Sequence, residues 1–173
     1  SIGFVIGLDY KNPYLSPYLE FQRFKHHPEI KKILEGGRRL NYGARALNEG
    51  GVQSLPKLTF PGGMFVGCEA GFLNVPKIKG THLAMKSGII AAQSIFENID
   101  TNDQILEYES SIKKSWLWKE LYKVRNIRPS FKWGFWKAIF YSAIDTYIFR
   151  GNAPWTIDHH GTDHESLGNK HDY

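Results

Sequence analysis

The chain has few of the residues and patterns on which several common kinds of protein depend. Its 173 residues include one cysteine, Cys68, which excludes within this chain an intramolecular disulfide framework, a four-cysteine zinc site and a cysteine-ligated iron–sulfur cluster. The longest uncharged run of the aromatic stretch 128–150 is seven residues, 138–144, whereas a transmembrane helix needs about 20. Apolar residues at 42% and charged residues at 23% exclude a disordered tail and a transmembrane bundle.

Several signals of function and targeting are also missing. The chain has no initiator methionine and no basic region ahead of its first apolar run, so we expect a piece of a longer protein and not a secreted precursor. No Ser/His/Asp arrangement, carboxylate pair or lysine-containing phosphate loop stands out, so we name no catalytic residue. The net charge of 22 − 17 = +5 points mildly to anionic partners. The basic pairs are scattered and match no nucleic-acid motif, so we expect no nucleic acid as a partner.

The chain does contain patterns of local structure, which predict an α+β fold. The pattern of prolines, glycines and apolar residues predicts strands at 2–8 and 64–67 and helices starting at Pro17 and Pro28, at 81–98 and at 103–126. Ile30, Ile33 and Leu34 should form the buried stripe of the second helix. Residues 151–173 are polar, rich in histidine and without periodicity, which favours a linker or exposed end.

The stretch 64–98 reads as a strand, a glycine-containing loop and a helix. A helix N-terminus presents unpaired N–H groups and the positive end of the helix dipole, which suit a phosphate or a carbonyl oxygen. Gly67, Gly71 and Gly80 would allow close backbone approach, and Thr81 could cap the helix or bind a ligand through its hydroxyl. From spacing alone, a plain connection with glycines in its turns is the favoured explanation, because isolated glycines are weak evidence of a site.

The residues of this stretch carry more information than their spacing. Residues 62–88, GGMFVGCEAGFLNVPKIKGTHLAMKSG, resemble the second FAD fingerprint of glutathione-reductase-like flavoproteins, and most of all that of the electron-transfer flavoprotein:ubiquinone oxidoreductase family. Further runs resemble the same family in the same order, so that the resemblance covers about residues 3–157: GLDYKNPY at 7–14, EFQRFKHHP at 20–28, YGARALNEGG at 42–51, WKELY at 118–122 and RNIRPS at 125–130.

The resemblance implies an enzyme that passes electrons from reduced electron-transfer flavoprotein to ubiquinone through FAD and a [4Fe–4S] cluster. It implies part of a glutathione-reductase-like FAD domain with an adjoining quinone-binding mixed-sheet domain. Residues 1–50 would end the quinone-binding domain, 51–98 return to the FAD domain, 99–150 form helices that reach the membrane, and 151–173 form the tail. The G-x-G-x-x-G turn and the cluster cysteines of that family are not in this chain, so the segment alone cannot perform the reaction.

The resemblance also implies cofactor-binding positions. Gly67 matches the family's glycine, and Cys68 stands where many related flavoproteins have the aspartate that binds the ribityl chain, so we expect backbone N–H groups to make that contact. Gly80 and Thr81 match the helix start that faces the flavin pyrimidine ring. Gln53 lies in a loop that resembles another flavin contact, and Asn74 either holds its loop or touches the cofactor.

The stretch 128–150 mixes aromatic and basic residues, as membrane–water boundaries favour. The expected membrane-surface residues are Phe131, Trp133, Phe135, Trp136, Phe140 and Tyr141. A buried helix pair is the alternative, but the resembled family is monotopic, which favours the membrane surface. The implied location is the matrix side of the mitochondrial inner membrane or the cytoplasmic face of a bacterial inner membrane. Two rival functions are a related membrane flavoprotein that reduces an isoprenoid lipid and a non-catalytic membrane-surface module.

The histidines support weaker inferences. His159, His160, His164 and His171 lie in the last 15 residues, where a metal site is conceivable but a solvated linker is favoured, so we expect no metal. His82 begins the helix beside the predicted flavin site, where packing or capping is favoured over proton transfer.

Overall fold

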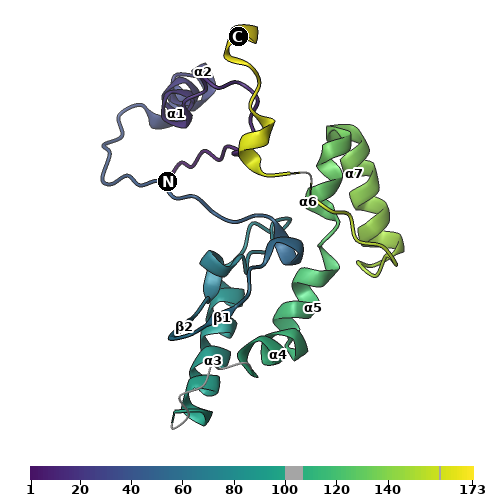
Figure 1. Cartoon of the computed structure of the whole chain (residues 1–173). Coiled ribbons are helices and arrows are strands. Elements are labelled where there is room, and N and C mark those ends of the chain that lie inside the picture. The colour runs from purple at the N-terminus through teal and green to yellow at the C-terminus, as the bar shows by residue number, and fades with distance from the viewer. Residues whose placement is uncertain (100–106, 160) are drawn as a thin grey trace. The chain divides into compact units, whose positions relative to one another are not determined.

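The computed structural model describes residues 1–99, 107–159 and 161–173 (Figure 1). The chain forms two compact units: unit 1 comprises Ser1–Ala44 and His160–Tyr173, and unit 2 comprises Arg45–His159. Unit 1 is built on two short α-helices, and unit 2 combines helices with a small antiparallel sheet. The chain is therefore α+β, as the sequence predicts.

The helices of unit 1 begin where the sequence predicts. Helix α1 spans Pro17–Lys25, and the Ser16 side chain caps it by accepting a hydrogen bond from the backbone N–H of Leu19 at 3.5 Å. Helix α2 spans Pro28–Leu34 and has no buried residue; Ile33 is 78% exposed in the structure. The predicted buried stripe is therefore wrong for this chain, because Ile30 and Leu34 are only half-buried and Ile33 is exposed. Short 3₁₀ turns, η5 (Asp163–Ser166) and η6 (Lys170–Asp172), complete the unit.

The strand predicted at 2–8 does not form among the described residues. This segment has irregular backbone, and its main contact is the Phe4 ring, which stacks on Phe21 at 5.9 Å and on Phe24 at 5.2 Å. A strand needs a neighbour that completes its backbone hydrogen bonds, and no described segment pairs with these residues. The prediction of a strand here is wrong for this chain.

The small sheet of unit 2 lies before its helices in the chain. Strands β1 (Thr59–Phe60) and β2 (Gly63–Met64) pair antiparallel, with Thr59 opposite Met64. The turn between them contains Gly62 at φ +81°, a conformation that favours glycine. The buried strand predicted at 64–67 is wrong, because the regular strand ends at Met64 and the Phe65 and Val66 side chains are exposed. Two 3₁₀ turns, η1 (Gly51–Ser54) and η2 (Gly67–Ala70), lie on either side of the sheet in the chain.

The helices of unit 2 follow the predicted order with one difference. Helix α3 spans Thr81–Glu97, which confirms the helix expected at 81–98. The single helix expected at 103–126 is instead α4 (Glu107–Lys114) and α5 (Trp116–Lys123), and its first four residues lie outside the described residues. The break falls at Ser115, whose hydroxyl donates to the Ile112 carbonyl at 2.7 Å and so competes with helical backbone bonding. Two short elements, α6 (Ile127–Ser130) and η3 (Phe131–Trp133), come before the last regular helix, α7 (Phe135–Ala143). The π-helix η4 (Ile144–Ile148) follows directly after α7.

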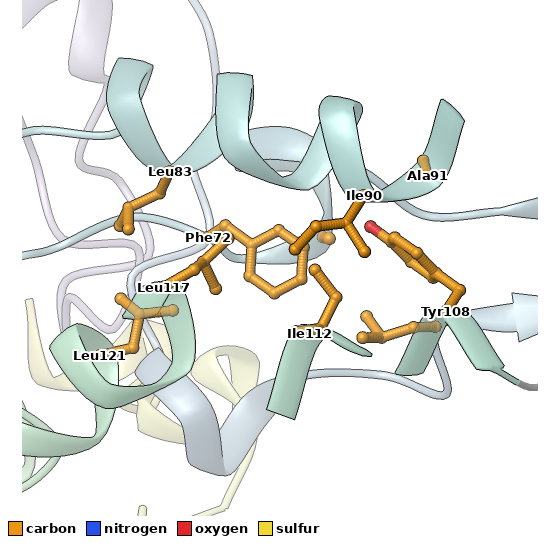
Figure 2. Close-up of a cluster of buried hydrophobic side chains, with 10 residues drawn as sticks. Phe72, Leu83, Ile90, Ala91, Tyr108, Ile112, Leu117 and Leu121 are labelled. Atoms are coloured by element: carbon orange, nitrogen blue, oxygen red, sulfur yellow. The ribbon is translucent and has the colours of Figure 1, made fainter. Parts of the chain in front are cut away.

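The core of unit 2 lies between α3, α4 and α5 (Figure 2). The fully buried Phe72 ring, from the loop before α3, sits among side chains of all three helices. The surrounding buried residues are Leu58, Ala70, Leu83, Ile90, Ala91, Tyr108, Ile112, Leu117 and Leu121. The opposite side of α3 is apolar but exposed, and Phe96 is 78% exposed. The helix therefore has one packed face and one apolar face that no described residue covers.

The segment after η4 packs closely against the rest of unit 2. The buried Arg125 guanidinium donates five hydrogen bonds: to Thr156 Oγ1 and to the carbonyls of Tyr122, Gly151, Ala153 and Trp155. Ala153 and Ile157 are buried as well. Residues 151–159 thus differ from the exposed linker that composition suggests for 151–173.

Candidate functional site at the start of helix α3

The first turn of α3 presents backbone N–H groups without a side-chain cap. Gly80 is the N-cap residue, and its carbonyl accepts the Ala84 N–H at 2.8 Å, but no side chain caps this end of the helix. Thr81 follows at the first helical position with an exposed side chain. The helix dipole places partial positive charge here. This end of α3 can therefore donate hydrogen bonds to a ligand oxygen.

Three other predicted residues lie around this helix start. The Cys68 sulfur lies so close to Gly80 that a Cβ at residue 80 would be 2.5 Å from it. Gly67 has φ +68°, and a Cβ on it would be 3.5 Å from the Ala84 Cβ of α3. The structure thus brings Gly67, Cys68, Gly80 and Thr81 together at one end of α3.

The backbone N–H of Gly67 already has a partner. It donates to the hydroxyl of buried Ser87 at 2.9 Å, and that hydroxyl donates in turn to the Ala84 carbonyl at 2.8 Å. The sequence leads us to expect that backbone N–H groups contact the ribityl chain in place of an aspartate. In this arrangement such a contact would have to come from a neighbouring N–H and not from Gly67.

Asn74 holds its own loop. Its side chain is fully buried, Nδ2 donates to Glu120 Oε1 at 2.8 Å, and Oδ1 accepts the Lys77 N–H at 3.2 Å. Its backbone pairs with that of Lys79 across the loop. Of the two roles open from the sequence, the geometry supports loop holding; a contact with the cofactor stays a prediction.

Gln53 ties together distant parts of unit 2. Its Nε2 donates to the carbonyl of Arg125 at 2.7 Å and to the carbonyl of Ile157 at 3.1 Å. Its Oε1 is buried and has no hydrogen-bond partner in the part of the chain that the structure describes. The amide nitrogen is therefore in structural use, and the predicted flavin contact would fall to the oxygen.

Glu120 is a central residue of this region that no motif in the sequence singles out. Its Oε1 accepts hydrogen bonds from Asn74, from Lys77 Nζ at 3.0 Å and from His82 Nε2 at 2.9 Å. Burial raises the pKa of the Glu120 carboxyl, but the hydrogen bonds from His82, Lys77 and Asn74 and the charge of Lys77 outweigh it and lower the pKa to about 2. The only signal in the sequence is its place in the WKELY run at 118–122.

His82 has the packing role that the sequence favours. Besides its bond to Glu120, its ring stacks on Trp116 with the centroids 5.9 Å apart and the planes 6° from parallel. Of the C-terminal histidines that the structure describes, His159 bonds to the Gly50 carbonyl at 2.6 Å and His164 bonds to Thr162. No cluster of His, Cys, Asp or Glu suited to a metal ion occurs within residues 1–99, 107–159 and 161–173.

These residues fit one end of FAD. The pyrimidine ring of a flavin carries carbonyl oxygens and is anionic when reduced, so it suits the N–H groups at the start of α3 and the Thr81 hydroxyl. The Cys68 sulfur and Leu73 fill the space that a side chain at residue 80 would need, so the close packing of the helix start depends on glycine there. The dinucleotide turn that would hold the other end of FAD is not in this sequence.

The aromatic stretch places large apolar side chains at the surface of unit 2. Trp136 and Phe140 lie one turn apart on α7 and are 80% and 71% exposed, whereas Ala138 on the same helix is buried. Phe131, Trp133 and Phe135 are also exposed. Tyr141 is half-buried, and its hydroxyl accepts a hydrogen bond from Trp155 Nε1 at 2.8 Å. None of the helices in the described ranges is long and apolar enough to span a bilayer.

Unit 1 contains an open groove of its own. The groove is lined by Phe4, Glu20, Arg23, Phe24, His26 and His27. The lining combines two aromatic side chains with four polar or charged ones.

Comparison with known proteins identifies relatives of both units. Residues 1–47 match the family model described as "ETF-QO, ubiquinone-binding". The chain is 59% identical to the bovine "Electron transfer flavoprotein-ubiquinone oxidoreductase, mitochondrial", 54% to that of rice and 50% to that of Dictyostelium discoideum, in each case over 96% of this chain. It spans about 29–30% of the length of these relatives. The chain is therefore homologous to a segment of the electron transfer flavoprotein-ubiquinone oxidoreductases, as its motifs predict.

Proposed function

We propose that this chain is part of an oxidoreductase that transfers electrons from reduced electron-transfer flavoprotein to ubiquinone. The observation that carries the proposal is the identity of 50–59% to proteins of that name along 96% of the chain. The match of residues 1–47 to a ubiquinone-binding family model supports a quinone as the final electron acceptor.

The proposal assigns different tasks to successive segments. Residues 1–50 end the quinone-binding domain, and residues 51–98 contribute the second FAD motif to the FAD domain. Residues 99–150 provide helices and the membrane-surface region. Residues 151–159 contact the helical segment and the FAD segment through Arg125 and Gln53. The tail, which composition places at 151–173, therefore begins after residue 159.

FAD, when bound, accepts and donates the electrons. The residues of this chain bind and orient its ring: the first-turn N–H groups of α3 and the Thr81 hydroxyl donate hydrogen bonds to ring oxygens and so stabilise negative charge there. The transfer of electrons itself makes and breaks no covalent bond in this segment, so we assign no catalytic acid or base to it. The iron–sulfur cluster must be held by cysteines elsewhere in the protein, because Cys68 is the only cysteine here.

The proposal includes attachment to the membrane surface at 128–150. Exposed Trp136 and Phe140 beside Lys132 and Lys137 are suited to the boundary between lipid tails and headgroups. Ubiquinone is lipid-soluble. Attachment at 128–150 would therefore place the opening of the quinone site against the bilayer, where ubiquinone can enter from the lipid. The names of the relatives include "mitochondrial", which supports a location at the mitochondrial inner membrane.

The test uses the purified full-length protein that contains this segment. We expect flavin absorbance, its bleaching by reduced electron-transfer flavoprotein, and reduction of a soluble ubiquinone analogue in the same mixture. Membrane-bound protein without flavin would overturn the proposal in favour of a non-catalytic module. Flavin that reduces an isoprenoid double bond and leaves the quinone untouched would overturn it in favour of the related reductase.

A further inference from the structure

We infer that Glu120 is a positioning residue for the flavin end of the cofactor. It lies outside the set of predicted FAD contacts and acts on them through the loop before α3 and through His82. The inference rests on the proposed function, because it concerns the cofactor that the start of α3 would hold.

One carboxylate oxygen connects three parts of unit 2. Glu120 is on α5, His82 is the second residue of α3, and Asn74 and Lys77 belong to the loop that leads into Gly80. Leu83 and Leu121, the residues that follow His82 and Glu120, point into the same core cluster (Figure 2). The core therefore fixes α3 and α5 in place, and Glu120 links the loop to both.

The loop itself needs such an anchor. Ile78 has φ +52°, a left-handed conformation that is unfavourable for a β-branched residue and persists only where surrounding contacts enforce it. The contacts within the loop are the Ile78 N–H to the Val75 carbonyl at 2.9 Å and the two backbone bonds between Asn74 and Lys79. Glu120 holds the side chains of Asn74 and Lys77 just before this strained residue. Since Gly80 and Thr81 follow directly, the position of the loop sets the geometry of the helix start.

The charge of Glu120 contributes as well as its position. Its carboxylate balances the Lys77 ammonium close to the positive end of α3. A neutral side chain of the same shape would leave that positive charge unbalanced near the helix start that would hold the flavin ring. The uncompensated charge would favour the reduced, anionic ring over the oxidised one.

Three variants of the full-length enzyme test the inference. In Glu120→Gln, which keeps the shape, we expect FAD to be retained while the flavin midpoint potential becomes more positive. In Glu120→Ala, which removes all three hydrogen bonds, we expect FAD to dissociate at least tenfold faster and the backbone amides of residues 74–79 to exchange hydrogen at least tenfold faster. Glu109→Gln is the matched control, because Glu109 pairs with Lys113 within α4 at 2.7 Å; it should change none of these quantities.

The outcomes separate this inference from the proposed function. A wild-type enzyme that binds FAD, with both Glu120 variants identical to it in potential, FAD dissociation and exchange, would overturn the positioning role alone. A general loss of thermal stability in Glu120→Ala with unchanged FAD dissociation would also overturn it, since that result describes a purely structural residue. Absence of flavin from the wild-type protein would overturn the proposed function and this inference together.

Discussion

The sulfur of Cys68 fills the space that a side chain at Gly80 would need, because a Cβ there would lie 2.5 Å from Sγ and 3.0 Å from Leu73 Cδ1. We therefore expect Gly80→Ala to lower the melting temperature of the full-length protein, by an overpacking cost of about 1–3 kcal/mol. Cys68→Ala in the same chain should restore part of the loss, since it removes the sulfur. Gly43→Ala is the control, because a Cβ there meets no atom within 4 Å. Equal melting temperatures for Gly80→Ala and wild type would contradict the close approach.

Thr81 should influence the flavin through its hydroxyl. We expect Thr81→Ala to leave the fold intact and to lower the flavin midpoint potential, since a hydrogen bond to the reduced, anionic ring is lost. At about 1–3 kcal/mol for a bond to a charged group, the change would be on the order of tens of millivolts. Thr81→Ser keeps the hydroxyl and should retain the wild-type potential. A redox titration in which Thr81→Ala matches wild type would contradict this contact.

The ionisation of Glu120 should make its contribution to stability depend on pH. Its pKa falls from the ordinary 4.5 to about 2 in the folded protein, so the contribution is fully present above pH 4.5 and is lost as pH falls toward 2. We expect the difference in melting temperature between wild type and Glu120→Gln to be constant from pH 7 to 5 and to shrink between pH 4.5 and 3. Thermal melts across this range would measure it. A difference that stays the same at pH 3 would show that the carboxylate charge contributes nothing.

Arg125 should be essential for the packing of residues 151–157. Replacing it with lysine removes the forked group that serves five acceptors, and each buried carbonyl left without a donor costs about 1–3 kcal/mol. We expect Arg125→Lys to lower the melting temperature and to expose this segment to limited proteolysis. Lys119→Met, on the exposed side of α5, should do neither. Unchanged protection of residues 151–157 in Arg125→Lys would show that other contacts hold them.

The exposed aromatic residues of 128–150 should determine membrane binding. We expect replacement of Trp133, Phe135 and Trp136 by Gln to release the full-length protein from liposomes in a flotation assay, because the variant lacks the side chains suited to the interface. The control replaces Tyr14 and Tyr18, which are exposed in unit 1, with Gln. If the triple variant floats as wild type does, the contact surface lies elsewhere.

The sequence predicts elements well where their signals are local. Ser16 and Pro17 lie beside the helix that they start, and α3 begins at the predicted residue. A local pattern could not show whether strands form at 2–8 and 64–67. A strand depends on a neighbouring segment that completes its hydrogen bonds, and the pattern does not contain that neighbour. The break between α4 and α5 depends on one serine hydroxyl in an otherwise continuous amphipathic stretch.

The residues of the candidate site also fall into a group that the sequence could predict and a group that it could not. Gly67, Cys68, Gly80 and Thr81 belong to one continuous motif, so the sequence could group them. The role of Asn74 depends on a carboxylate 46 residues further along the chain, and Gln53 bonds across 72 and 104 residues. No local pattern encodes such pairings, so Glu120 and the structural use of Gln53 became visible only in the folded chain.

The bond from Gln53 to the Ile157 carbonyl has a consequence for protein synthesis. Because it joins residues 104 positions apart, unit 2 cannot complete its hydrogen-bond network until the ribosome has released residue 157. Until then the nascent chain lacks the carbonyls of residues 151–155 that Arg125 needs, and that guanidinium has to remain hydrated. A translational stall before residue 151 would therefore yield a chain whose helices can form but whose Arg125 cannot be buried.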